Sequence, residues 1–175
     1  VAPQRFWMGQ RMIIAFTGHR PTKLGGWKEP NPVKRLVKAE LVRLLTELKP
    51  EHVISGMALG VDQWAAEIAF DLGIPFLAAV PCDDQDRIWK PEAQTRYREL
   101  LAKAMHVVVV SPGPYAVRKM PVRNHWMVDH CDKLIAVWDG SPGGTSECVS
   151  YAKRRGKPII TVVPRELLDR VTKEP

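Results

Sequence analysis

Short apolar runs alternate along the chain with longer stretches in which apolar residues recur every three or four positions. The short runs lack the apolar/polar alternation of a half-exposed strand, which is typical of strands buried on both faces of a parallel sheet. They predict strands at residues 12–16, 52–55, 74–80, 106–111, 134–138 and 158–163.

The longer stretches predict amphipathic helices between these strands. From Val33 to Leu48 the apolar positions fall on one helical face, and Pro50 ends the pattern. Comparable stretches predict helices from about 62 to 72, 91 to 105, 122 to 130, 145 to 155 and 165 to 171, with loops at 17–32 and 112–121.

Strands that alternate with helices predict one α/β domain over residues 12–175, a three-layer Rossmann-like fold with a mainly parallel sheet. Residues 1–11 show no period. We therefore expect them to form a poorly ordered leader outside the domain.

Composition narrows the class of protein. The net charge of +7 comes from basic residues that are dispersed along the chain, so a phosphorylated small molecule explains it as well as DNA does. No apolar run approaches the roughly 20 residues that span a bilayer, and we expect a cytoplasmic protein without a membrane partner. Cys82, Cys131 and Cys148 lack the paired spacing of metal ligands, which favours free thiols and no metal or other cofactor.

The stretch from Leu134 to Glu147 passes from an apolar strand to a glycine turn and a helix start. Gly143 and Gly144 allow a ligand to approach the backbone closely. Thr145 is expected to cap a helix whose free N–H groups and dipole favour an anion, most commonly a phosphate. An ordinary tight turn is the alternative interpretation.

In a parallel α/β sheet all strand-to-helix loops lie at one edge, where ligands bind near the switch in strand order. The polar clusters at 17–20, 56–62, 82–85, 111–123 and 139–147 are therefore expected to line one cleft. The predicted ligand-binding residues are Thr17, Gly18, His19, Arg20, Ser55, Gly56, Gly60, Gln85, Trp89, Asn124, Asp139, Gly140, Gly143, Gly144 and Thr145.

Several of these motifs together resemble the SLOG superfamily over residues 12–164. The resemblance is carried by 17–21 (TGHRP), 55–62 (SGMALGVD), 64–67 (WAAE), Gln85 with Trp89 and Tyr97, 123–124 (RN), 127–129 (MVD) and 143–145 (GGT). Their order looks most like the branch of bacterial and phage proteins called domain of unknown function 1273. The lonely-guy phosphoribohydrolases are more distant.

The resemblance implies a nucleotide or nucleotide-derived ligand. In lonely-guy enzymes an Arg and a Glu that follows a PGGxGTxxE turn support hydrolysis of the base–ribose bond of a nucleoside 5′-monophosphate. Arg123 matches that Arg, with Asn124 in place of the family's Lys. The glycine turn departs from the family pattern, because Glu147 follows Thr145 by two residues instead of three, a rotation of about 100° on a helix.

N-glycosidic cleavage passes through an oxocarbenium-like state that a carboxylate stabilises. Glu147 and Asp62 are the candidate carboxylates, and Arg123 completes the predicted catalytic set. Each carboxylate also has a structural alternative to catalysis: Glu147 would place a favourable charge in the first turn of its helix, and Asp62 would cap its helix. Arg123 and Arg20 are expected to hold phosphate oxygens, unless they are surface ion-pair partners.

Three functions remain open from the sequence. The first is hydrolysis of the N-glycosidic bond of a nucleoside 5′-monophosphate, the second a sensor that binds a nucleotide without turnover, and the third a DNA-binding module. Trp89, Tyr97 and Trp126 either stack on a base or pack in the core. Trp126 and Met127 also offer an apolar patch for a homo-oligomer, unless the core uses both side chains.

Overall fold

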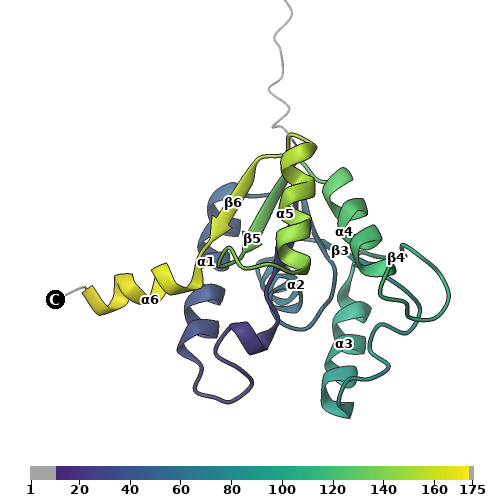
Figure 1. Cartoon of the computed structure of the whole chain (residues 1–175), viewed down its shortest axis with the longest axis horizontal. Helices are drawn as coiled ribbons and strands as arrows, with labels where there is room; N and C mark the ends of the chain where they lie inside the picture. The colour runs from purple at the N-terminus through teal and green to yellow at the C-terminus, as the bar shows by residue number, and fades with distance from the viewer. Residues whose placement is uncertain (1–10, 174–175) are drawn as a thin grey trace, which may run out of the picture.

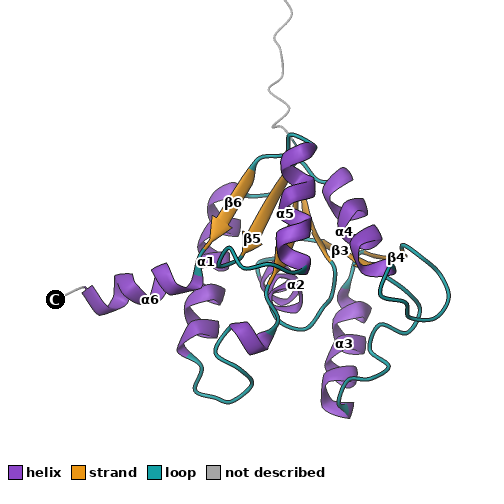
Figure 2. Ribbon diagram, in the orientation of Figure 1, coloured by secondary structure: helices purple, strands orange, loops and turns teal. Residues whose placement is uncertain are grey.

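The computed structural model describes residues 11–173, which fold into a sheet with helices on both faces (Figures 1 and 2). The described strands are β1 (Ile13–Gly18), β2 (His52–Ser55), β3 (Phe76–Val80), β4 (His106–Val109), β5 (Lys133–Val137) and β6 (Ile159–Val162). Their order is β4-β3-β2-β1-β5-β6, and every neighbouring pair is parallel. The predicted α/β Rossmann-like class is confirmed.

The helices divide between the two faces of the sheet. The described helices are α1 (Pro32–Leu48), α2 (Val61–Asp71), α3 (Pro91–Lys103), α4 (Lys119–Asp129), α5 (Gly144–Arg154) and α6 (Pro164–Lys173). One core cluster joins α1, α2, α3 and α6 to the sheet, and a second joins α4 and α5 to its other face. Figure 2 shows α4 and α5 together on the near side.

The central strands explain why their apolar runs lack alternation. On β5, Ile135 faces the cluster beneath α1 and α2, whereas Leu134 and Ala136 face the cluster beneath α4 and α5. All three are fully buried. Both faces of the strand therefore need apolar side chains.

The structure corrects some of the predicted boundaries. α4 begins at Lys119 inside the predicted loop 112–121, and a short 3-10 helix, η1 (Pro21–Lys23), interrupts the predicted loop 17–32. Residues 1–10 of the predicted leader lie outside the described residues, while Arg11 lies 3.6 Å from the Glu51 carboxylate. Within 11–173, no helix combines the length and apolar character needed to cross a membrane.

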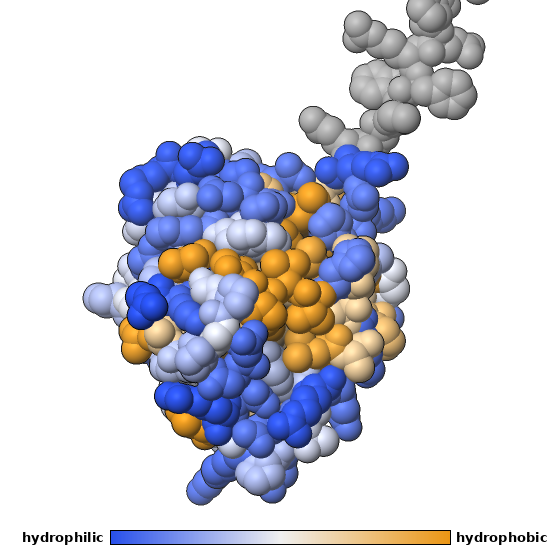
Figure 3. Space-filling view, turned by 90° about the vertical axis from the view of Figure 1, so that its right-hand side faces the viewer, coloured by the Kyte–Doolittle hydropathy of each residue, from blue (hydrophilic) through white to orange (hydrophobic). Residues whose placement is uncertain are grey.

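The predicted apolar patch at Trp126 and Met127 is wrong in its location. Met127 is 1% exposed because it packs between α4 and the sheet, and the Trp126 ring stacks on His130. Apolar surface instead gathers on the side of the molecule that carries the edge strand β4 (Figure 3), where Val107 is 47% exposed.

The topology places a crevice beside β1. The strand order runs from β1 to β2, β3 and β4 on one side and to β5 and β6 on the other. β1 leads to α1 on one face of the sheet, whereas β5 leads to α5 on the opposite face. Loops that diverge in this way leave space at the carboxyl ends of the two strands.

Candidate functional site

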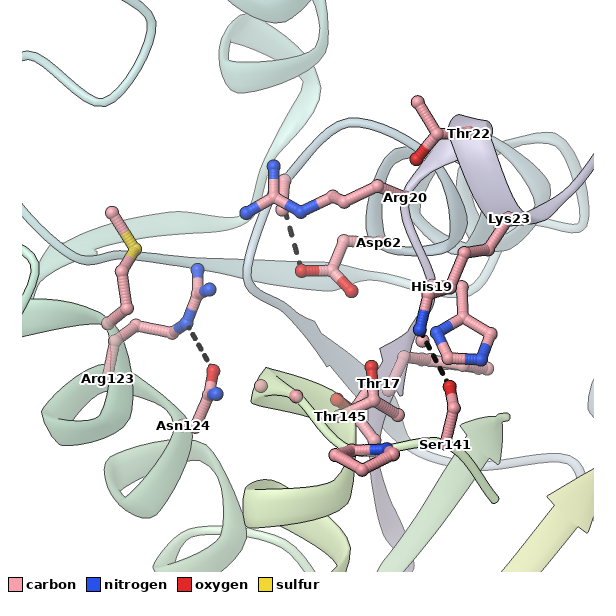
Figure 4. Close-up of a pocket in the computed structure, with 17 residues that line it drawn as sticks. Thr17, His19, Arg20, Thr22, Lys23, Asp62, Arg123, Asn124, Ser141 and Thr145 are labelled. Carbon is pink, nitrogen blue, oxygen red and sulfur yellow. Dashed lines mark hydrogen bonds between the residues drawn. The ribbon is translucent and has the colours of Figure 1, made fainter. Parts of the chain in front are cut away.

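A cavity of about 300 Å³ occupies this crevice (Figure 4). It is bordered by the loop after β1, the first turn of α2, one side of α4 and the turn between β5 and α5. The predicted site residues that line it are Thr17, Gly18, His19, Arg20, Asp62, Arg123, Asn124, Gly143, Gly144 and Thr145. Segments distant in sequence thus converge as expected.

The start of α5 supplies hydrogen-bond donors to the cavity. Gly143 precedes the helix with φ 143°, and a Cβ added to Gly144 would meet no atom within 4 Å. The N–H groups of Gly144, Thr145 and Ser146 have no acceptor among the described residues, since the first such bond is Glu147 N to Gly143 O at 3.0 Å. Such free amides at a positive dipole end suit an anion.

The predicted capping role of Thr145 is wrong. Thr145 is the second residue of α5, the helix begins after Gly143, and no side chain caps it. Thr145 is buried and borders the cavity. The absence of a capping side chain among the described residues leaves the helix end open toward the cavity.

Arg123 lies on α4 and is 4% exposed, so it is no surface ion-pair partner. Its Nη1 donates to the carbonyls of Gly56 and, at 3.3 Å, Ala79, and its Nε donates to Asn124 Oδ1 at 2.9 Å. Its Nη2 makes no hydrogen bond within the described part of the chain. Burial lowers the pKa of this guanidinium, but arginine stays charged at neutral pH.

Asp62 lies in the first turn of α2 with its carboxylate toward the cavity. Gly60, not Asp62, is the N-cap, so the helix-cap alternative is wrong. The Oδ2 atom of Asp62 accepts a long hydrogen bond of 3.4 Å from Ala58 N. Burial raises the pKa of Asp62, and the charges of Arg123 and Arg20 oppose that rise. A buried carboxyl with a raised pKa inside a cavity is suited to proton transfer.

Arg20 and Lys23 bring further positive charge to the cavity. Arg20 is exposed and forms no ion pair or side-chain hydrogen bond with residues 11–173. Lys23 Nζ donates to Ser141 Oγ at 2.7 Å, which connects η1 to the turn after β5 (Figure 4). Met120 and Ser141 lie in the predicted clusters 111–123 and 139–147, whereas Thr22 and Lys23 lie outside every predicted cluster, although they directly follow the TGHRP motif.

His19 and Asp139 hold the two sides of the crevice together. His19 Nε2 lies 2.7 Å from Asp139 Oδ1, and His19 N donates to Val137 O at 3.2 Å. Hydrogen bonds from the Ser141 hydroxyl and amide, with His19, hold the pKa of Asp139 well below its usual range. Asp139 therefore acts as an anchor for the loop, and Gly140 makes the turn that follows with φ 88°.

Three predicted site residues support the cavity without lining it, namely Ser55, Gly56 and Gly60. Ser55 Oγ donates to Asp62 O at 2.7 Å and accepts from Met57 N at 3.1 Å. A Cβ on Gly56 would lie under 3.0 Å from the side chains of Arg123 and Asp62. Only glycine at position 56 lets both charged groups approach the end of β2.

Glu147 is not brought to the cavity. Its Oε1 forms an ion pair with His125 Nε2 of α4, and its Oε2 is buried without a partner among the described atoms. Gln85 and Trp89 lie in a smaller adjoining chamber. The carboxylate that the structure does place beside Arg123 is Asp62.

Comparisons with known proteins agree with this architecture. One similar solved structure is that of DNA processing protein A of Helicobacter pylori, which is described in terms of its single-stranded DNA binding mode. It matches with a TM-score of 0.65 at 20% identity, and the match covers 94% of this chain and 74% of that chain. The molybdenum cofactor binding protein of Rippkaea orientalis matches with a TM-score of 0.57 at 18% identity, covering 94% and 86%. These likenesses show the shared fold.

Sequence similarity identifies the family. The uncharacterized SPbeta prophage-derived protein YoqJ of Bacillus subtilis is 31% identical over 144 residues, which cover 71% of this chain and 84% of that protein. The sequence model of the YspA SLOG family matches residues 14–167, nearly the range of the resemblance noted above. The chain therefore belongs to the YspA SLOG family.

Proposed function

We propose that the cavity binds a nucleotide or nucleotide-derived molecule through its phosphate group. The observation that carries this proposal is the convergence on one cavity of about 300 Å³ of three features: the open N-terminus of α5, the buried Arg123, and Arg20, which has no partner within residues 11–173. That volume lies at the lower end of the range for small-molecule sites.

The phosphate is expected at Gly144 and Thr145, whose N–H groups have no acceptor in the described part of the chain and lie at the positive end of the helix dipole. Arg20 is exposed and unpaired within the described residues, so it can turn toward a phosphate oxygen without breaking an existing bond. Charge-assisted hydrogen bonds of this kind contribute about 1.5–3 kcal/mol each.

The reaction proposed for this site is hydrolysis of the N-glycosidic bond of a nucleoside 5′-monophosphate. Water adds to C1′ as the C1′–N bond breaks, and the products are the free base and ribose or deoxyribose 5-phosphate. Asp62 supports this step better than Glu147, because its carboxyl lies in the cavity and its pKa is raised by burial. Arg123 holds the sugar phosphate beside it.

A sensor that binds the nucleotide without turnover is the second candidate. It is favoured by the hydrogen bonds of Arg123 to the carbonyls of Gly56 and Ala79, which give this guanidinium a structural role. DNA binding, as in the Helicobacter pylori protein, is the third, supported by the net charge of +7.

Incubation with a panel of nucleoside 5′-monophosphates, scored for released base, tests the reaction. Hydrolysis predicts release of base that Asp62→Asn slows at least about 100-fold, with Asp71→Asn as a matched control on the exposed end of α2. Binding without release establishes the sensor. DNA binding with a steep salt dependence, and no competition by nucleotides, would replace both.

A further inference from the structure

A second chamber of about 160 Å³ opens beside the main cavity and shares Arg20 and Met120 with it. The chamber is smaller than a typical complete ligand site. Because the two hollows share wall residues, we treat the second as a compartment of one cleft.

Two aromatic side chains form the walls of this chamber. Trp89 is half-buried and meets Tyr97 edge to face, with ring centroids 5.2 Å apart, which fixes the plane of the indole. Tyr115 is held through its backbone, whose N–H donates to Asp84 Oδ1 at 2.6 Å. Aromatic faces held in this way bind planar rings by stacking.

The polar groups that remain free in the chamber are mainly donors. Gln85 is not among them, because its Nε2 donates to Gly56 O at 3.1 Å and its Oε1 accepts from Tyr97 at 3.1 Å. Arg20 is assigned to the phosphate, which leaves Arg87 for the base: its side chain makes no hydrogen bond with the described residues, and its guanidinium lies 5.0 Å from the centre of the Tyr115 ring. Guanidinium groups donate hydrogen bonds and cannot accept them.

We infer that this chamber is the base subsite of the cleft, and that it favours bases whose edge carries carbonyl oxygens. This inference rests on the proposed function, since the phosphate must occupy the main cavity for the base to reach Tyr115. The ribose then lies at the boundary formed by Arg20 and Met120.

Calorimetric titration of the full chain with ribose 5-phosphate, inosine 5′-monophosphate and adenosine 5′-monophosphate tests the subsite. Stacking of the base should make the inosine nucleotide bind about tenfold tighter than ribose 5-phosphate. It should also bind tighter than the adenosine nucleotide, which replaces the carbonyl oxygen of the base with an amino donor.

Tyr115→Leu should remove most of the gain that the base provides while leaving the affinity for ribose 5-phosphate unchanged. That unchanged affinity shows that the variant is folded. Trp27→Leu is the matched control, because Trp27 is 63% exposed and lines neither chamber.

The outcomes separate the two proposals. If ribose 5-phosphate binds and the base adds nothing, or if the gain survives Tyr115→Leu, the base subsite is wrong and phosphate binding stands. A tighter adenosine nucleotide overturns the preference for carbonyl oxygens. If none of the three compounds binds, the proposed function fails together with the subsite.

Discussion

Asp62 and Glu147 both lie near the start of a helix but end in different environments. Each is the acidic residue in the first turn of a helix that starts at the same sheet edge, Asp62 in α2 and Glu147 in α5. Asp62 is the second residue of its helix and Glu147 the fourth. The two helices also cover opposite faces of the sheet, so the two side chains point in different directions.

The surroundings of the two carboxylates differ accordingly. Asp62 is 7% exposed and faces the cavity beside Arg123. The Glu147 side chain is 38% exposed and pairs with His125, whose ring stacks on Tyr151 with centroids 3.7 Å apart. Glu147 therefore belongs to the contact between α4 and α5, whereas Asp62 borders the cavity.

The largest expected difference between the two residues is in turnover. Asp62→Asn should slow base release at least about 100-fold, the usual lower contribution of a positioned acid or base, whereas Glu147→Gln should leave it nearly unchanged. Single-turnover measurement of released base provides the comparison. A loss in Glu147→Gln with full activity in Asp62→Asn would return the catalytic role to Glu147.

Removal of Arg123 should reduce stability as well as ligand binding. Arg123→Ala leaves the Ala79 carbonyl without this donor and the Asp62 carboxylate without its buried counter-charge, which should cost about 3 kcal/mol. Denaturant unfolding measures the change in free energy. Arg118→Ala, an exposed position one residue before α4, is the control and should have little effect.

The raised pKa of Asp62 predicts a pH-dependent gain in stability for Asp62→Asn. The folded state binds the proton of this carboxyl more tightly than the unfolded state, so ionisation costs stability as the pH rises above the ordinary value of 3.8. Asp62→Asn should therefore melt at a higher temperature than the native protein at pH 7. The difference should shrink toward pH 3, and a gain that is equal at both pH values would contradict the burial argument.

The smallest expected effect concerns the Glu147–His125 ion pair. Both side chains are more than a third exposed, so Glu147→Gln should cost only about 0.2–1 kcal/mol. A double-mutant cycle with His125→Ala isolates the pair. A coupling energy of several kcal/mol would show that this contact fixes the position of α5. It would contradict the minor role assigned to Glu147 in contrast to Asp62.

The sequence predicted the fold more fully than the site. Apolar runs without alternation located all the described strands. Burial on both faces explains this pattern for β1, β2, β3 and β5, whereas the edge strand β4 has an apolar run although it is exposed. The start of α4 was missed because Lys119, Met120 and Pro121 show no apolar period, and Lys119 is held instead by bonds from Nζ to the carbonyls of Pro112 and Pro114. Such side-chain bonds to distant backbone leave no pattern in the sequence.

The site was predicted as a set of loops, not as a set of contacts. The polar loops after β1, β2 and β5 converge because a parallel sheet requires it. The direction of Glu147, the anchoring bond of Asp139 to His19 and the separate chamber of Trp89 depend on helix rotation and loop geometry. Those features emerge only when the elements are packed together.

Phosphate recognition at the start of α5 is the central claim, and calorimetric titration with a nucleoside 5′-monophosphate and its unphosphorylated nucleoside tests it most directly. The space beside Gly144 accepts a side chain, so Gly144→Asp should fold and place a negative charge where the phosphate binds, while Gly144→Ala is the uncharged control. The account predicts that the native protein and Gly144→Ala bind the nucleotide and not the nucleoside, and that Gly144→Asp binds neither. Equal affinity for nucleotide and nucleoside, or full nucleotide affinity in Gly144→Asp, would contradict it.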